Sequence, residues 1–296
     1  MPALRPAISA PDRRALASQA LKAAVAARAK GGQNQQSPIC IYGLSEALGV
    51  IVRFNDINME GMYEKGERPR IHLSAKRPLV RRAYNCAHEL GHHIFKHGFS
   101  IDELKEDARE SSWDDPKEFL ADTFAGFVLM PIVGLRQSFS SRGWNPATAS
   151  AAQMYIVACD FGVGYGTLLT HLSAGVGLIS FARATALRKA TLKSIRTEIV
   201  GDAILNHLVV ADSYRLSPVL DVEVGMRVLL PTGVEAADPN LKFERDTQTG
   251  RLFKAERQGI VQTVTPDGAW ANFVRIAPKE YIGLAQYRHL EEDSDE

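Results

Sequence analysis

The chain has 296 residues, 45% of them hydrophobic and 23% charged, which is the composition of a globular protein with a hydrophobic core. Its formal net charge of +1 gives no sign of a general affinity for nucleic acid or for a membrane surface. No apolar run reaches the roughly 18–20 residues that span a bilayer, and the three widely spaced cysteines are no disulfide framework, so we expect a cytoplasmic protein without a transmembrane helix.

The first thirty residues carry six basic side chains and a single acid, Asp12, among many alanines. An organellar transit peptide can have this character, but it is usually also rich in serine. We therefore favour an amphipathic helix that Asp12 caps and that turns Leu16, Ala20 and Val25 inward. The polar stretch that follows is expected to be a flexible linker, so that residues 1–38 form an N-terminal helix and linker.

Short strands and helices are expected between residues 39 and 140, as in an α+β domain. The predicted elements, in chain order, are a helix at 39–48, strands at 49–54, 59–63 and 70–73, and helices at 78–96 and 116–130, the last ended by Pro131. If the strand formed by Arg70, Ile71, His72 and Leu73 is the edge strand over a cleft, it could pair with an extended peptide substrate.

The chemistry is concentrated in the second half of the helix predicted at 78–96. His88 and His92 lie one helical turn apart and only about 40° apart around the axis, so that their imidazoles can share one metal ion. Glu89 follows His88 and lies beside the metal position rather than on it, as a general base must. A catalytic zinc site takes three protein ligands and leaves one position for water. The spacing therefore predicts a zinc site that still needs a third ligand.

The third ligand is expected to come from another helix. The extended pattern with a third histidine needs it at position 98, which is Gly98, and on a continuous helix His97 lies about 180° from His88. Glu118, at the start of the helix predicted at 116–130, is the candidate that we favour. Its alternative is a solvated acid that stabilises the N-terminus of that helix.

Further polar side chains lie close to these residues in the sequence. Asp122 shares a helix face with Glu118, at i, i+4 spacing, so its carboxylate can orient a ligand imidazole. Asp114 and Asp115 compete with Glu118 for the metal. The candidates for the donor that a tetrahedral oxyanion needs are Tyr84, His93 and His97.

Two of these motifs resemble a known family. The segments 88–92 (HELGH) and 118–125 (EFLADTFA), followed by Leu129-Met130-Pro131, are similar to those of the ImmA/IrrE metallopeptidases, and the resemblance covers roughly residues 39–180. It implies a thermolysin-like (gluzincin) peptidase core in which His88, His92 and Glu118 bind Zn²⁺ and Glu89 is the base. It also implies that the substrate is a partner transcriptional repressor, cut in a response to stress, DNA damage or mobile elements. The sequence departs from the family at Asp122, where asparagine is common, and at Gly164, where serine is frequent.

Residues 141–198 are expected to be helical, and the stretch 153–172, with its turn at Gly162, is typical of a helix–turn–helix. Such a pair can place its second helix in the major groove of DNA. The second helix, from Tyr165 to Leu172, carries no lysine or arginine, however, and affinity for DNA comes largely from phosphate contacts with such residues. We therefore favour a structural or substrate-docking pair over a sequence-specific DNA reader, and expect any DNA binding to be weak.

The remaining sequence predicts a β-rich domain of unassigned role at 199–290, with strands at 222–230, 259–264 and 270–276, and an acidic tail at 291–296. Two functions fit the whole chain. One is a zinc endopeptidase that acts on a protein, and the other is a DNA- or protein-binding regulator with an inactive peptidase fold. Glu89 favours the enzyme, because an inactive scaffold has no need of a general base.

Overall fold

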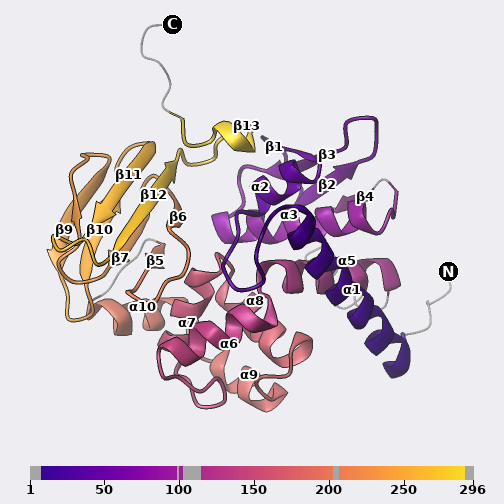
Figure 1. Ribbon diagram of the computed structural model, residues 1–296, viewed down its shortest axis with the longest axis horizontal. Helices are drawn as coiled ribbons and strands as arrows, with labels where there is room; N and C mark the ends of the chain where they lie inside the picture. The colour runs from indigo at the N-terminus through magenta and orange to yellow at the C-terminus, as the bar shows by residue number, and fades with distance from the viewer. Residues whose placement is uncertain (1–7, 99, 103–114, 203–206, 291–296) are drawn as a thin grey trace, which may run out of the picture. The chain divides into compact units, whose positions relative to one another are not determined.

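The computed structural model describes residues 8–98, 100–102, 115–202 and 207–290 of the chain. Over these residues the fold is mixed α+β, as the sequence predicts, with nine α-helices and three small β-sheets (Figure 1). The chain divides into a first unit, Met1–Val133 with Ile282–Ala285, and a second unit, Gly134–Tyr281 with Gln286–Glu296. The domain boundaries predicted at residues 38, 140 and 198 stay predictions, and the acidic tail at 291–296 lies outside the described residues.

A five-stranded sheet forms one layer of the first unit. Its strands lie in the order β13-β1-β3-β2-β4, and β1 and β3 are parallel while the other pairs are antiparallel. The strand bounds are β1 (Ile51–Asn55), β2 (Gly61–Glu64), β3 (Arg70–Ser74), β4 (Ser100–Asp102) and β13 (Gly283–Leu284). The prediction that residues 70–73 form an edge strand is wrong, because β1 and β2 pair with both sides of β3.

The helices of the first unit are α1 (Ala10–Lys30), α2 (Ile41–Ala47), α3 (Leu79–Ile94) and α5 (Pro116–Leu129). The predicted helices at 78–96 and 116–130 are thus confirmed as α3 and α5. Helix α3 packs against β2, β3 and α5, and α1 also packs against α5 (Figure 1). Helix α3 therefore contacts both the sheet and α5.

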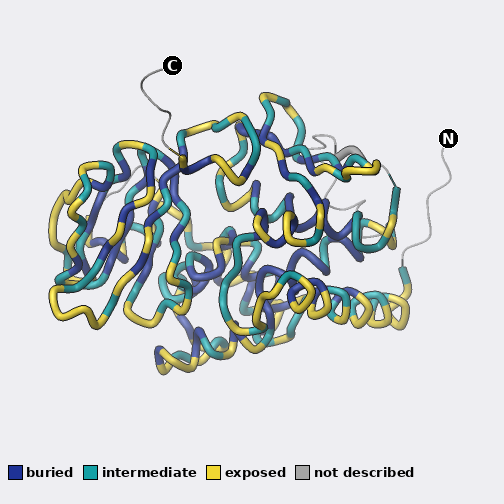
Figure 2. Tube along the Cα trace, turned by 45° about the horizontal axis from the view of Figure 1, so that its top comes forward, coloured by how far each residue is buried: buried dark blue, intermediate teal, exposed yellow. Residues whose placement is uncertain are grey.

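Helix α1 confirms the predicted N-terminal helix, but its N-cap and part of its buried face differ from the prediction. Ser9, rather than Asp12, caps it, since the Ser9 side chain accepts from the backbone N–H of Asp12. The buried stripe consists of Ala20, Ala24 and Ala27, whereas Val25 is 44% exposed and does not point inward. Figure 2 shows exposed turns along this helix, next to the end marked N. Small side chains on the buried stripe let α1 lie close to α5.

Arg28 fastens the end of α1 to α5. Its side chain is fully buried, and its guanidinium donates to the backbone carbonyls of Asn34, Ser37 and Val128. Burial lowers the pKa of Arg28 to about 10, so the group is still charged at neutral pH. Val128 lies in the last turn of α5, where the helix dipole is negative and a cation is stabilised.

The second unit combines short helices with two four-stranded sheets. Its helices are α6 (Ile132–Ser141, which begins in the first unit), α7 (Ala151–Asp160), α8 (Tyr165–Thr170), the π-helix η1 (His171–Gly175), α9 (Phe181–Leu187) and α10 (Leu192–Val200). Gly162, with a φ of 62°, makes the turn between α7 and α8. Gly164 caps α8 without a side-chain hydrogen bond, which is the weaker helix start expected for glycine at this position.

The two sheets have the strand orders β5-β7-β10-β9 and β6-β12-β11-β8. Their strands are β5 (Leu208–Val210), β6 (Val219–Glu223), β7 (Arg227–Leu230), β8 (Glu235–Ala236), β9 (Leu241–Asp246), β10 (Arg251–Ala255), β11 (Gly259–Val264) and β12 (Ala271–Ala277), and the 3-10 helix η2 (Ala285–Tyr287) follows β13. The predicted single strand at 222–230 is wrong. Gly225, with a φ of 89°, turns the chain between β6 and β7, which belong to different sheets.

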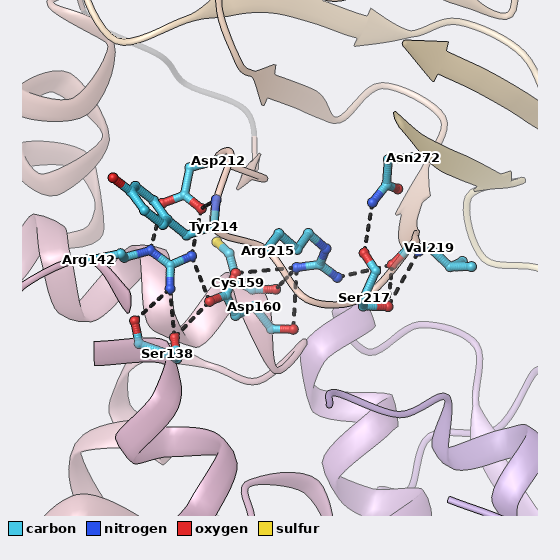
Figure 3. Close-up of polar contacts among 10 residues, drawn as sticks. All are labelled: Ser138, Arg142, Cys159, Asp160, Asp212, Tyr214, Arg215, Ser217, Val219 and Asn272. Carbon is cyan, nitrogen blue, oxygen red and sulfur yellow. Dashed lines mark hydrogen bonds and ion pairs between the residues drawn. The ribbon is translucent and has the colours of Figure 1, made fainter. Parts of the chain in front are cut away.

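A buried network of charges holds the helices of the second unit to the segment between β5 and β6. Arg142, at the end of α6, donates to both carboxylate oxygens of Asp212 at 2.6 Å and contacts Asp160 at 2.8 Å (Figure 3). Arg215 donates to the carbonyls of Cys159 and Asp160, at the end of α7. The side chains of Arg142, Asp160 and Arg215 are no more than 5% exposed. Each buried charge therefore has an opposite charge beside it, as burial requires.

No single helix among the described residues is long and apolar enough to cross a membrane. Helices α5 and α6 reach that length and apolar character only when taken together, as a pair bent by about 40°.

Candidate metal centre

Helix α3 presents two buried histidines and a buried glutamate on one stretch of chain. His88 and His92 are 7% and 1% exposed, and Glu89 is fully buried. The Nε2 atoms of the two histidines point to the same place and lie 3.0 Å apart. This is the arrangement that the i, i+4 spacing predicts.

Glu118, in the first turn of α5, completes the cluster. Its carboxylate oxygens lie 3.3 Å from His88 Nε2 and 3.6 Å from His92 Nε2. Burial alone would raise the pKa of Glu118, but hydrogen bonds and charge interactions with His88 and His92 outweigh it and hold the pKa well below its usual range. The carboxylate is therefore ionised at neutral pH, as a metal ligand must be. Among the described residues, these three are the group whose geometry could hold a metal ion.

The three ligand atoms are spaced as zinc requires. Ligand atoms at about 2.0–2.1 Å from zinc in tetrahedral array lie about 3.3–3.4 Å from one another. The two Nε2 atoms lie 3.0 Å apart, and the carboxylate of Glu118 lies 3.3 Å from His88 Nε2 through Oε2 and 3.6 Å from His92 Nε2 through Oε1, distances that lie on either side of that value. Two imidazole nitrogens with one carboxylate are also a donor set that zinc prefers, and they leave a fourth position for water or substrate. The residues present therefore fit a catalytic zinc ion.

Gly91 lets the two helices of the site approach each other closely. A Cβ atom added at Gly91 would lie 3.0 Å from Ala121 Cα and 3.2 Å from Phe124 Cδ1. Ala121 and Phe124 are fully buried in α5, so α5 has no room to accept a side chain at this point. The glycine inside the histidine motif thus brings Glu118 within reach of the imidazoles, a role that the sequence alone did not indicate.

Glu89 lies against the backbone of strand β2. A Cβ atom added at Gly61 would be 3.1 Å from Glu89 Oε1, so this strand passes over the carboxylate with no side chain between them. Glu89 does not belong to the group of converging ligand atoms. Glu89 therefore follows His88 on α3 and lies outside this group of three, and its role as a base stays a prediction.

The outer nitrogen of His88 is held by Asp122. Asp122 Oδ1 lies 2.9 Å from His88 Nδ1, so that this nitrogen donates while Nε2 faces the cluster. Tyr84 donates its hydroxyl to the carbonyl and carboxylate of Asp122, at 3.3 and 3.4 Å. The contact of Asp122 with His88 is the one that an orienting role requires. Tyr84, predicted as an oxyanion donor, uses its hydroxyl toward Asp122.

His97 contacts the outer nitrogen of His92, which the sequence analysis did not anticipate. That analysis assumed a continuous helix and placed His97 on the far side from His88. Helix α3 ends at Ile94, however, and the chain turns back, so that His97 Nδ1 lies 3.0 Å from His92 Nδ1. Burial, with smaller effects from His92 and Lys117, lowers the pKa of His97 to about 4. His97 is therefore neutral at pH 7.

The other candidate residues lie in different surroundings. His93 points toward the sheet, where its Nδ1 is 2.9 Å from the Tyr63 hydroxyl, and burial together with the charge of Lys30 lowers its pKa. Asp115 caps α5 and accepts from the backbone N–H of Lys117 at 2.8 Å. Asp114, the other competing carboxylate, lies outside the described residues.

Comparison with known proteins agrees with the geometry of the site. Residues 45–173 match the Peptidase M78 family model, which is described as the IrrE N-terminal-like domain. The match contains all three converging ligands as well as Glu89. A search of curated proteins finds no match to the chain. Residues 45–173 of this chain are therefore similar to the IrrE N-terminal-like domain of the Peptidase M78 family, the family that its motifs resemble.

Proposed function

We propose that the protein is a zinc-dependent endopeptidase in which His88, His92 and Glu118 bind the metal and Glu89 is the general base. The observation that carries the proposal is the convergence of two imidazole Nε2 atoms and one ionised carboxylate at tetrahedral spacing. The family match, which spans these residues, supports a metallopeptidase-like function. A zinc ion held there would polarise a peptide carbonyl and acidify a water molecule.

The roles of the protein's own groups follow from their positions. Glu89 takes the proton from the attacking water and delivers it to the leaving amine, and its burial beside His88 keeps it next to the reacting atoms. Asp122 holds the His88 ring so that Nε2 faces the metal position. Glu118 supplies the negative charge of the ligand set.

The fold relationship and the substrate rest on the family resemblance. We propose a thermolysin-like core, a cytoplasmic location, and as substrate a partner repressor of the helix–turn–helix type. We also propose that α7 and α8 form a helix–turn–helix-like pair with a structural or substrate-docking role, and that any DNA binding is weak. The absence of lysine and arginine from residues 165–172 supports this preference.

A pair of glutamate variants tests the proposal. Glu89→Gln should keep about one zinc per chain, because Glu89 is no ligand, while cleavage of a protein substrate falls by about 10²–10⁴-fold. Glu118→Gln should bind zinc more weakly, and excess zinc should restore part of the activity. Zinc content after dialysis and cleavage rate measure the two effects separately.

Either of two results would refute the assignment. Full zinc retention in both His88→Ala and His92→Ala would show that these histidines do not form the metal site. Undiminished cleavage by Glu89→Gln would show that Glu89 is not the general base. The alternative, a peptidase fold that serves only for binding, would instead be favoured if the zinc-loaded wild type cleaved no protein.

A further inference from the structure

The C-terminal end of α3 is built as a Schellman motif around the second histidine of the metal centre. The backbone N–H of His97 donates to the carbonyl of His92 at 3.0 Å, and that of Lys96 donates to the carbonyl of His93 at 3.1 Å. These are the 6→1 and 5→2 hydrogen bonds that define the motif. They reverse the chain directly after the helix.

The reversal requires a left-handed residue, and this residue is not a glycine. Lys96 has a φ of 57°, and among the described residues only Glu280 shares a positive φ without being glycine. A left-handed conformation is strained for a residue that carries a side chain. Glycine is the usual residue at this place in the motif. The chain thus keeps a strained residue immediately before His97.

The motif brings two particular residues together. A Schellman motif commonly has a hydrophobic contact between the residue after the turn and the residue five positions before it. Here these residues are His97 and His92, and a hydrogen bond between their Nδ1 atoms, 3.0 Å apart, takes the place of that contact. The His97 ring also stacks on Phe95, with centroids 5.6 Å apart. Phe95 in turn packs edge-on against Phe124 of α5.

We propose that His97 is the positioning residue of the ligand His92, in the way that Asp122 positions His88. Because Nε2 of His92 faces the cluster, its Nδ1 is left to donate to Nδ1 of His97, 3.0 Å away. The stacked Phe95 ring and the Schellman turn fix the position of the acceptor. The two histidine ligands are thus held by different groups, one by a carboxylate and one by an imidazole.

The inference rests on the proposed zinc site, so its test measures metal binding directly. Zinc affinity is measured by competition with a chromophoric chelator for the wild type, His97→Ala, His97→Asn and Lys96→Gly, and the visible spectrum of the Co²⁺-substituted proteins reports the ligand geometry. Loss of a group that orients a metal ligand typically weakens metal affinity by about 10–100-fold. We expect that loss, and a changed Co²⁺ spectrum, for His97→Ala.

The other two variants separate positioning from packing. The Oδ1 atom of asparagine occupies nearly the place of histidine Nδ1, so His97→Asn should recover most of the affinity and the wild-type Co²⁺ spectrum. Lys96→Gly keeps the turn and His97 and should bind zinc as the wild type does. If His97→Asn is as weak as His97→Ala, or if His97→Ala binds zinc like the wild type, the positioning role is overturned. If the wild type binds no zinc, the proposed function fails instead.

Discussion

Substitution of Gly91 by alanine tests how the helix contact assembles the site. The new methyl group would lie 3.0 Å from the backbone Cα of Ala121 and 3.2 Å from Phe124 Cδ1. Overpacking of a tight core costs about 1–3 kcal/mol, and alanine returns up to about 1 kcal/mol as the better helix former. Because the nearest atom belongs to the backbone of α5, the contact is relieved only by moving the two helices apart. We expect a net loss of about 1–2 kcal/mol and weaker zinc binding.

Urea unfolding of chelator-treated protein measures the stability term, and chelator competition measures the zinc affinity. Gly166→Ala is the matched control, since Gly166 lies in helix α8 with no atom within 4 Å of an added Cβ. It should be neutral or stabilising by up to about 1 kcal/mol and should leave zinc binding unchanged. A Gly91→Ala protein with the stability and zinc affinity of the wild type would show that the close approach of α3 and α5 does not set the site geometry.

Three further predictions concern acidic residues. Asp122→Ala should weaken zinc binding by about 10–100-fold, while Asp122→Asn, which still accepts from His88 Nδ1, should lose less; equal losses in a chelator competition would contradict the orienting role. Asp115→Ala should lower the free energy of unfolding by about 1 kcal/mol through loss of the α5 cap and keep the zinc; loss of zinc would make Asp115 a ligand. In the second unit, burial would raise the pKa of Asp221, but His289, Arg288 and Arg275 outweigh it and lower that pKa. Its stabilising contribution is therefore full above the unfolded-state pKa of about 3.9 and is lost as the pH falls below it. Asp221→Asn should flatten the fall in unfolding temperature between about pH 5 and pH 3, and an unchanged slope would refute the assignment.

Local spacing was sufficient to predict the central part of the site. His88, Glu89 and His92 lie on one helix, so the geometry of that helix alone determines which side chains share a face. Glu118 and Asp122 lie at i, i+4 spacing on a second helix, and one contact between the two helices brings both sets together. The structure brings His88, His92 and Glu118 together and places Asp122 beside His88.

Features that depend on where a helix ends were not predicted. His97 was expected on the far side of α3 because the helical pattern was extended past Ile94. The usual signal for a helix end is a glycine at the left-handed position, and this chain has Lys96 there. In α1 Ala20 is buried as expected, whereas Val25 was wrongly expected to point inward.

Strand pairing also could not be predicted from the sequence. The segment 70–73 has the composition of a strand, but whether it lies at an edge depends on β1 and β2, which pair with it from either side. Likewise the alternation across 222–230 continues through Gly225, although the two halves join different sheets. Pairing is decided by contacts between distant residues, and such contacts leave little trace in a local pattern.

The charge network of the second unit limits where this chain can be truncated or recombined with another. The family match ends at residue 173, yet Arg142 and Asp160 within it depend on Asp212 and Arg215 beyond it. A chain shortened at that point would keep one buried arginine and one buried aspartate without half of their partners, and breaking a buried ion pair costs about 3–5 kcal/mol. The strands after residue 207 therefore cannot be exchanged as a free-standing module. Recombination that replaces them has to carry the ends of α6 and α7 along.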